Sequence, residues 1–426
     1  MSAARAHARP ILSSRLIQLL AADRDDSRTV LSVATNKNPE IHTTTTIRDT
    51  SAVLKRNLLT TALHSAATYL YDLDGFPGKA GWWGRPNEPS ESSSIWATVK
   101  AAREIARDRL WRETNASLVP VEIALIVDDV SPAYFATAGG PIPPTDPDLG
   151  FSSVLHYMPA HELARTGAAF RTFLLSDLLL PSFQTEVLPS LKLIVFANAL
   201  RIEPAVRSYI GTTLAQGGRT LLYIWAPNSI REDSEGAVSF DASGPAAITG
   251  LPLVQGPGES SLQAAISGFA FPYFGPSYGI SPWFTLDGSP PEVSVLAWYR
   301  SSKRPALVQK SFGSHTVVFS GAVMLPTEVY TKIARAAGVH MLLTTASDVV
   351  DVGGTALMVV AGDPTLHAAR EISLPRRFGA VIGASSGAYL GDANATSTQT
   401  VCKRCDGFKT AEMAPGDVSL FYLEEL

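Results

Sequence analysis

The sequence predicts an α/β fold in three consecutive parts. These are a partial βα-barrel remnant over residues 1–118, a doubly wound α/β domain over residues 119–340, and a small antiparallel β-sandwich over residues 341–426. A chain of 426 residues is too long for one hydrophobic core, which favours two or three domains. In the middle of the chain, apolar strand-like runs alternate with segments of helical spacing. Near the C-terminus, short strand-like runs are separated by Gly, Ser, Asp and Pro.

The first part contains about one and a half units of a βα-barrel. Apolar residues recur at helical spacing over residues 48–66, with Lys55 and Arg56 on the polar side. A short strand is predicted over residues 67–73, followed by a Gly- and Trp-rich loop and a helix over residues 92–112. Because the usual barrel neighbours are missing, the apolar faces of both helices are expected to pack on the doubly wound domain or on another subunit.

The second part begins after Pro120 with a near-continuous apolar run over residues 121–127. Such a run suits a parallel sheet that is covered on both faces. The alternation of strand and helix then repeats, which predicts a doubly wound arrangement. The further segments predicted here are helices at 161–168, 203–216 and 326–337, and strands at 170–175, 191–197, 220–225, 292–299 and 314–320.

The third part consists of strands and turns. Its short apolar runs alternate with turn residues, which is typical of an antiparallel β-sandwich. The predicted strands are 349–352, 356–361, 370–374, 381–382 and 418–423.

Charge and hydropathy exclude several classes of protein. The formal net charge is −4, whereas a nucleic-acid binder normally presents a basic face. No stretch of eighteen or more apolar residues occurs, so no membrane-spanning helix is expected. The segment Met1–Leu20 carries three arginines and no acidic residue, which would fit an organelle transit peptide. No apolar core of the secretory type is present, and we favour a cytoplasmic location. The segments that follow favour the interior of a longer protein over a transit peptide.

Cys402 and Cys405 form a single C-x-x-C pattern. A structural zinc site requires four ligands, and no second pair follows. A redox motif would be expected near the start of a helix, whereas this pair lies among Thr, Asp and Gly before the last predicted strand. We therefore expect two incidental thiols of a hairpin, and we predict no metal site and no cofactor.

Several segments, taken in order, resemble the C-terminal part of β-galactosidase-like glycoside hydrolases of family 42. Residues 25–29 (DDSRT) resemble an acidic D-x-R-T segment on a late barrel strand, and residues 69–73 (YLYDL) resemble the aromatic-rich last barrel strand. Residues 127–131 (VDDVS) and 174–178 (LLSDL) are similar to the first two strand ends of the family's amidotransferase-like domain. Residues 223–227 (YIWAP) are similar to a later strand of that domain.

The resemblance continues to the end of the chain. Residues 336–340, 348–350 and 372–375 resemble the junction into the family's terminal β-domain, and residues 419–424 resemble its closing strand. The family resemblance implies the end of a TIM barrel, then a flavodoxin- or amidotransferase-like domain that mediates trimerisation, then a small β-domain. It also implies carbohydrate as the ligand and a homo-oligomer, specifically a trimer.

The resemblance locates the expected chemistry near the N-terminus. Hydrolysis of this type requires two carboxyl groups across the glycosidic bond. Only 22 residues precede Asp23, so the barrel strand with the acid/base residue is expected to be absent. Arg24 stands where the family has its nucleophile, and an arginine cannot form a glycosyl-enzyme. Asp23 and Asp25 flank it as weak catalytic candidates, and the alternative is a solvated charge cluster. Arg28 is a candidate for binding sugar hydroxyls.

An aromatic loop supplies the other predicted substrate-binding residues, which are Tyr71, Asp72, Asp74, Trp82 and Trp83. Aromatic rings stack on the C–H faces of sugars, and carboxylates accept hydrogen bonds from sugar hydroxyls. An equally weighted alternative is that these aromatic side chains pack between the barrel and the α/β domain.

Other chemistry has weaker support. The middle domain has no cysteine, which excludes amidotransferase catalysis, and it has no G-x-S-x-G elbow. Asp128 and Asp129 at a strand end could bind a metal, but strand-end acids more often cap a neighbouring helix. Three functions remain open. They are a family 42-like glycoside hydrolase, a non-catalytic carbohydrate-binding or oligomerisation protein derived from that family, and a small-molecule binder that uses the α/β strand ends.

Overall fold

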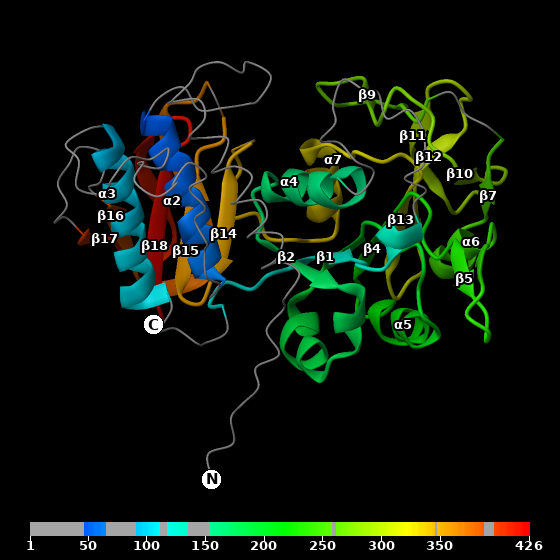
Figure 1. Ribbon diagram of the computed structural model, residues 1–426, viewed down its shortest axis with the longest axis horizontal. Coiled ribbons are helices and arrows are strands. Elements are labelled where there is room, and N and C mark those ends of the chain that lie inside the picture. The colour runs from blue at the N-terminus through cyan, green and yellow to red at the C-terminus, as the bar shows by residue number, and fades with distance from the viewer. Residues whose placement is uncertain are drawn as a thin grey trace, which may run out of the picture. The chain divides into compact units, whose positions relative to one another are not determined.

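The computed structural model describes residues 47–64, 91–110, 117–134, 153–257, 261–345, 347–363, 365–386 and 396–426 (Figure 1). The chain divides into two compact units. The α/β unit comprises Val121–His340, and the helix–sheet unit comprises the described residues up to Pro120 together with Met341–Leu426. In the described part, none of the helices combines the length and the apolar composition that crossing a membrane requires.

Five parallel strands form one half of the main sheet in the α/β unit. Their order is β2 (Phe170–Leu174), β1 (Ile123–Val127), β3 (Leu193–Phe196), β4 (Thr220–Ile224) and β13 (Thr316–Ser320). The strand order reverses at β1, because the chain places β2 on one side of it and β3 on the other. The α/β class predicted from the sequence is therefore confirmed.

The apolar runs of the sequence explain why these strands lie in the middle of the unit. Strands β1, β3 and β4 are buried along their whole length, as a sheet covered on both faces requires. On adjacent strands, Phe196 and Tyr223 stack with their ring centroids 4.7 Å apart. The helices of this unit are α4 (Met158–Ala164), α5 (Pro204–Tyr209), α6 (Gly244–Thr249) and α7 (Thr327–Ala336). Shorter 3₁₀ turns lie at Ser131–Tyr134, Leu175–Leu179 and Leu188–Ser190, and π-helical turns at Ser153–Tyr157, Phe183–Val187 and Ile210–Leu214.

An antiparallel extension continues the same sheet beyond β13. Its strands, in order, are β12 (Pro305–Ser311), β11 (Ser294–Tyr299), β8 (Ala264–Ile266) and β9 (Tyr273–Phe274). Two further pairs lie outside the main sheet: β7 (Leu253–Gln255) with β10 (Phe284–Leu286), and β5 (Ile230–Glu232) with β6 (Val238–Phe240). The sequence pattern predicts the segments of β11 and β13 but misses β12 and the short strands. Two or three residues cannot show a period.

The helix–sheet unit contains a five-stranded antiparallel sheet. Its order is β14 (Val349–Gly353), β15 (Ala356–Val360), β18 (Val418–Glu424), β16 (Ala368–Ser386) and β17 (Thr396–Met413). Helix α2 (Ile47–Leu63) and helix α3 (Glu91–Ile105), which a π-helical turn at Ala106–Leu110 continues, pack on this sheet. The buried side chains of this contact include Leu59, Leu63, Ala102, Ile105, Leu110, Met358, Val418, Leu420 and Tyr422.

Two expectations about the helices are wrong. Helical segments 48–66 and 92–112 are expected to pack on the doubly wound domain or on another subunit, yet they pack on the C-terminal strands. The approach is close, since a Cβ atom on Gly353 would lie 2.1 Å from the carbonyl oxygen of Leu63. Lys55 does not lie on a polar side: it is 8% exposed, and its Nζ donates a hydrogen bond to the carbonyl oxygen of Val418 at 2.9 Å. Helical spacing indicates that one face is buried, but it does not identify the partner.

The predicted β-sandwich is not confirmed. The described strands form one antiparallel sheet, and the register of β16 breaks between Ser373 and Phe378. Before the break β16 pairs with β17 and makes a single bridge to Leu343, and after it β16 pairs with both β17 and β18. The rings of Phe408 on β17 and Phe421 on β18 lie 4.7 Å apart, although β16 separates these strands in the sheet. The β16–β17 hairpin therefore folds over the sheet and encloses a second apolar layer.

Cys402 and Cys405 form a disulfide within β17, so the expectation of two incidental thiols is wrong. In a regular strand, residues three apart are separated by about 10 Å. The Cα atoms of the two cysteines lie 6.3 Å apart. Arg404 between them has a left-handed φ of 48°, which bends the chain and brings the two side chains together.

Candidate functional site

The site residues predicted from the sequence all lie outside the described residues. This applies to Asp23, Arg24, Asp25, Arg28, Tyr71, Asp72, Asp74, Trp82 and Trp83. Their roles stay predictions. The candidate site that the structure does describe lies in the α/β unit, at the edge where the parallel strands end.

The carboxyl ends of β1 and β3 meet where the strand order reverses, which is the usual ligand position in an open α/β sheet. Asp128 follows β1 directly, and Asn198 follows β3 by two residues. The backbone N–H of Asp128 donates to Asn198 Oδ1 at 2.7 Å, and Asn198 Nδ2 donates to the carbonyl oxygen of Asp128 at 2.8 Å. This reciprocal pair joins the two strand ends.

The Asp128 carboxylate is used locally. It accepts hydrogen bonds from the backbone N–H groups of Val130 and Ser131 and from Ser131 Oγ at 2.5 Å. Ser131 Oγ in turn accepts from the N–H of Leu200 at 3.1 Å. Burial raises the pKa of the Asp128 carboxyl above its ordinary value, although the hydrogen bonds from Ser131 and Val130 oppose this effect. The geometry supports the capping role of Asp128 over metal binding, and no cluster of metal-binding residues occurs within the described ranges.

A second acidic group stands at the end of β2. Asp177 Oδ2 accepts a hydrogen bond from the backbone N–H of Leu174 at 2.9 Å. Burial raises the pKa of the Asp177 carboxyl, and the negative charge of Asp129 adds to that shift. The edge at β1 and β2 is therefore an acidic rim that disfavours anionic ligands.

The end of β4 has an unusual backbone. Trp225 and Asn228 adopt left-handed φ angles of 68° and 57°, which are rare for residues other than glycine. The indole N–H of Trp225 donates to the carbonyl oxygen of Pro282 at 2.7 Å. Asn228 is 1% exposed and its side chain donates to the carbonyl oxygen of Gly244 at 3.3 Å. A Cβ atom on Gly244 would lie 1.8 Å from the backbone carbonyl oxygen of Asn228, so only glycine fits there.

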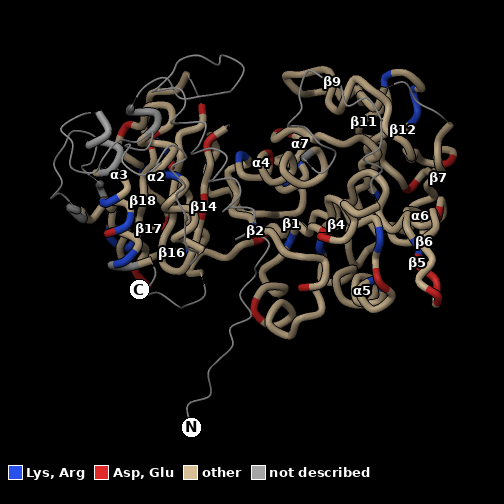
Figure 2. The backbone as a smooth tube through the Cα atoms, in the orientation of Figure 1, with Lys and Arg blue, Asp and Glu red and all other residues tan. Residues whose placement is uncertain are grey.

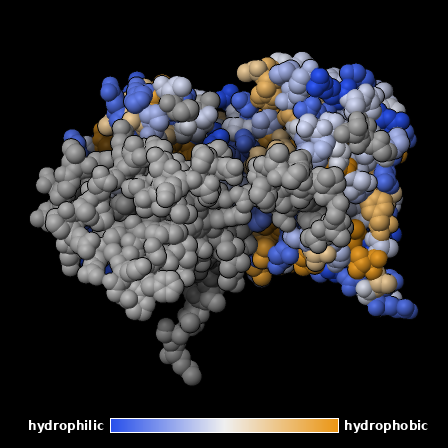
Figure 3. All heavy atoms as spheres, turned by 45° about the horizontal axis from the view of Figure 1, so that its top comes forward, coloured by the Kyte–Doolittle hydropathy of each residue, from blue (hydrophilic) through white to orange (hydrophobic). Residues whose placement is uncertain are grey.

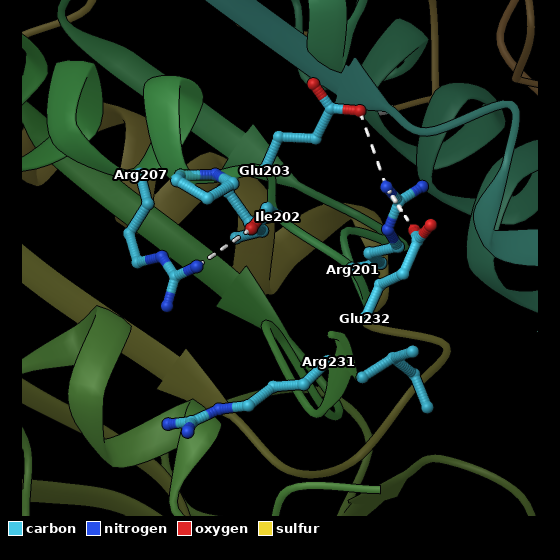
Figure 4. A pocket seen from close by; sticks show the side chains of 8 residues that line it. Arg201, Ile202, Glu203, Arg207, Arg231 and Glu232 are labelled. Carbon is cyan, nitrogen blue, oxygen red and sulfur yellow. Dashed lines mark hydrogen bonds and ion pairs between the residues drawn. The ribbon is translucent and has the colours of Figure 1, made fainter. Parts of the chain in front are cut away.

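A hollow of about 250 Å³ opens beside the same edge (Figure 4). It is lined by Arg201, Ile202, Glu203, Pro204, Arg207, Ile230, Arg231 and Glu232. Backbone hydrogen bonds bring its two sides together, since the N–H of Ile230 donates to the carbonyl oxygen of Leu200 at 2.9 Å. The sequence analysis did not identify this hollow. The only signal for it is the gathering of charged residues after two consecutive predicted strands.

The charges in the hollow largely compensate one another. Arg201 Nη2 lies 2.5 Å from Glu232 Oε2 and 3.6 Å from Glu203 Oε1. Arg231 forms an ion pair with Asp241, and Arg207 donates only a long hydrogen bond, 3.4 Å, to the carbonyl oxygen of Ile202. Figure 4 shows Arg201 between the two glutamates, with Arg207 and Arg231 on the other side. A guanidinium fills the space between these carboxylates where a glycosidic bond would have to lie, so the pair does not suit glycoside hydrolysis.

No family model matches this sequence, and no curated protein matches it in sequence. Solved structures do match it. A catalytic mutant of Gan42B, a family 42 β-galactosidase from G. stearothermophilus, is 9% identical, with a TM-score of 0.54 over 88% of this chain and 51% of that one. The β-galactosidase from Bacillus circulans sp. alkalophilus is 11% identical, with a TM-score of 0.51 over 80% of this chain and 46% of that one.

The β-galactosidase from the psychrophilic Marinomonas ef1 gives the same result, with 13% identity and a TM-score of 0.51 over 91% of this chain and 51% of that one. This chain thus spans about half the length of these enzymes. At such low identity the likeness concerns the fold and not the chemistry. Most of this chain shares its fold with part of the family 42 β-galactosidases.

Proposed function

We propose that this chain is a glycoside hydrolase family 42-like protein that binds carbohydrate. The observation that supports the proposal is the match in fold to β-galactosidases over 88% of the chain. The ligand class follows from those enzymes, whose names state that they act on β-galactosides. The proposed contacts are Tyr71, Trp82 and Trp83 as stacking surfaces and Asp72 as an acceptor for sugar hydroxyls. Arg28 and Asp74 complete the proposed set.

We propose in addition that the chain binds sugars without hydrolysing them. Arg24 occupies the position that corresponds to the family nucleophile, and Asp23 and Asp25 carry their carboxylates on arms one carbon shorter than glutamate. Within the described residues, Glu203 and Glu232 share a hollow but are bridged by Arg201. Self-association into a trimer is a further part of the proposal, and sedimentation of the purified chain would test it.

Calorimetric titration of the full chain with galacto-oligosaccharides tests the binding. We expect saturable binding that weakens roughly thirtyfold when Trp82 and Trp83 are both replaced by Ala, because stacking contributes about 1 kcal/mol per aromatic ring, or about 2 kcal/mol for the two rings. Phe240→Ala, which removes an exposed aromatic ring from β6, is the matched control and should bind normally. Equal binding by the double variant and the wild type would contradict the proposed contacts, and no binding by any of them would contradict the carbohydrate function.

Hydrolysis of nitrophenyl galactosides tests the second part. We expect no turnover above background. Turnover that disappears on replacing Asp23 and Asp25 by Asn would show that the family chemistry survives with an unusual nucleophile. Turnover that persists in that variant would place the catalytic groups elsewhere in the chain.

A further inference from the structure

Two exposed aromatic side chains lie in one row on the outer face of the antiparallel extension. Trp298 on β11 is opposite Ala265 on β8, and Ala265 is opposite Tyr273 on β9. Residues directly opposite in an antiparallel pair point to the same face of the sheet. Trp298 is 42% exposed and Tyr273 is 41% exposed, so both rings present surface to solvent. Because Ala265 between them has a small side chain, the surface between the two rings is shallow. The row spans two strand spacings, about 9.5 Å.

The alternation along the strands shows that this face is the solvent side of the sheet. The neighbouring row, Tyr299, Ala264 and Phe274, points the other way and is buried. The pairing of the strands thus holds the rings of Trp298 and Tyr273 side by side on the exposed face, while the opposite face of the sheet is buried. Figure 3 shows that hydrophobic side chains on the viewed face of this unit come in small patches among hydrophilic ones. Exposed aromatic pairs of this kind mark interaction surfaces more often than scattered single apolar residues do.

A fixed guanidinium completes the row. The Arg300 guanidinium lies 4.3 Å from the centroid of the Tyr273 ring, and its Nη1 donates to Gln263 Oε1 at 3.3 Å. The backbone N–H of Arg300 donates to the carbonyl oxygen of Gln263 at 2.8 Å, which continues the ladder between β11 and β8. Arg300 therefore stands two residues beyond Trp298 on the same face, and two contacts restrain its side chain before any ligand binds.

The charged residues of the β11–β12 turn are all basic. Lys303 and Arg304 lie in the same β11–β12 turn as Arg300, and Figure 2 shows basic residues near β11 and β12. None of the three forms an ion pair with a described residue. The segment 261–286, which supplies β8 and β9, contains no Asp, Glu, Lys, Arg or His at all. An anionic group that approaches Trp298 thus meets a guanidinium and no nearby carboxylate from these strands.

We propose that Trp298, Ala265, Tyr273 and Arg300 form a binding surface for an acidic oligosaccharide that contains uronic acid units. The indole face of Trp298 stacks on the C–H face of one sugar ring, and Arg300 pairs with the carboxylate of the adjacent ring. A restrained arginine suits a planar carboxylate, because it offers two parallel N–H donors at a reduced entropic cost. The inference rests on the proposed carbohydrate function. A single-stranded nucleic acid would also use aromatic and basic side chains, but the net charge of −4 disfavours a polyanion of high charge density.

Titration of the full chain with tri-galacturonate, galactotriose and oligo-dT tests the proposal. We expect tri-galacturonate to bind at least about tenfold more tightly than galactotriose at this surface, with an affinity that falls as salt is added. Trp298→Ala and Arg300→Gln should each weaken uronate binding roughly tenfold. The control variants are Phe240→Ala, an exposed ring elsewhere in this unit, and Arg335→Gln, an exposed cation on α7, and both should bind as the wild type does.

The outcomes separate this inference from the proposed function. Galactotriose binding that depends on Trp82 and Trp83, together with no uronate binding, overturns the uronate surface and leaves the proposed function standing. Uronate binding that is lost in Trp298→Ala, with no binding to the aromatic loop, supports the surface and overturns the loop. Oligo-dT binding that exceeds uronate binding, or uronate binding unchanged in Trp298→Ala and Arg300→Gln, overturns the proposal. Intrinsic fluorescence and circular dichroism of each variant establish that it is folded.

Discussion

Lys55 should make the stability of the helix–sheet unit depend on pH in an unusual direction. The side chain lies on α2, is 8% exposed, and donates from Nζ to the carbonyl oxygen of Val418 on β18. Burial lowers the pKa of the Lys55 ammonium from 10.5 to about 8, and the negative charge of Asp417 opposes this shift only in part. At neutral pH the Lys55 side chain is protonated, and burial of this charge lowers the stability of the folded state.

The sign follows from proton linkage. Between about pH 8 and 10.5 the unfolded chain holds a proton on Lys55 that the folded chain has released, so stability rises with pH in this window. For these two pKa values, the contribution of Lys55 to the free energy of unfolding grows by about 2 kcal/mol between pH 7 and 9.5. Replacement of Lys55 by Met, which keeps the length of the side chain, removes this contribution. The free energy of unfolding of the wild type should therefore rise by about 2 kcal/mol relative to that of the variant over the same range.

Urea unfolding followed by circular dichroism at pH 7 and 9.5 measures this difference. Comparison of variant with wild type at each pH cancels the tyrosines, which also titrate near the upper limit. Lys100→Met, which removes an exposed lysine from α3, is the control and should leave the difference constant. A Lys55→Met curve parallel to that of the wild type would refute the argument, since it would mean that Lys55 has the same pKa in the folded and unfolded chain.

Three further predictions concern single contacts. Asp348→Ala should lower the free energy of unfolding by about 3–5 kcal/mol, measured by urea denaturation, because it leaves the fully buried Arg370 without its 2.5 Å partner. A loss of stability no larger than that caused by breaking an exposed ion pair would contradict this prediction. Gly256→Ala should lower the melting temperature, because the new Cβ would lie 2.0 Å from the ring of Trp283; an unchanged near-ultraviolet spectrum would contradict the clash. Asn198→Ala should lower the free energy of unfolding by about 1–3 kcal/mol, because the backbone N–H and the carbonyl oxygen of Asp128 lose their hydrogen bonds to the Asn198 side chain. Amide exchange at the end of β1 should become faster.

The sequence predicts the parallel half of the sheet well and the helix–sheet unit less well. Continuous apolar runs such as residues 121–127 and 220–225 carry a strand signal in themselves, because a strand covered on both faces needs no partner of particular sequence. The pattern of segment 48–66 predicts that one face of the helix is buried, but it does not predict what that face packs against. Its partner strand, β18, lies more than 350 residues away in the chain, and the hydrogen bond from Lys55 to Val418 depends on that distant pairing. No local pattern could have predicted it.

The candidate site that the structure describes is likewise predicted from the sequence only in part. Asp128 stands out in the sequence because it ends an apolar run, and its capping role follows from that position. The hollow around Arg201 does not stand out, because residues 201–207 and 230–232 are far apart in the sequence and meet only in the fold, through contacts such as the ion pair between Arg201 and Glu232. The row of Trp298 and Tyr273 depends on register across three strands, one of them two residues long. Such a register is fixed by pairing and not by composition.

The two halves of the main sheet differ in what they leave available to a ligand. At the reversal point of the parallel half, Asp128, Ser131 and Asn198 direct most of their hydrogen-bonding groups at one another and at nearby backbone. This arrangement stabilises the strand ends but offers few donors or acceptors to a ligand. In the antiparallel half, Trp298 and Tyr273 remain exposed, and Arg300 lies over the Tyr273 ring without an ion pair to any residue of the described ranges. A fold whose side chains at the reversal point bond mainly to one another can therefore still present a recognition surface, because the antiparallel extension has an outer face that the core does not need.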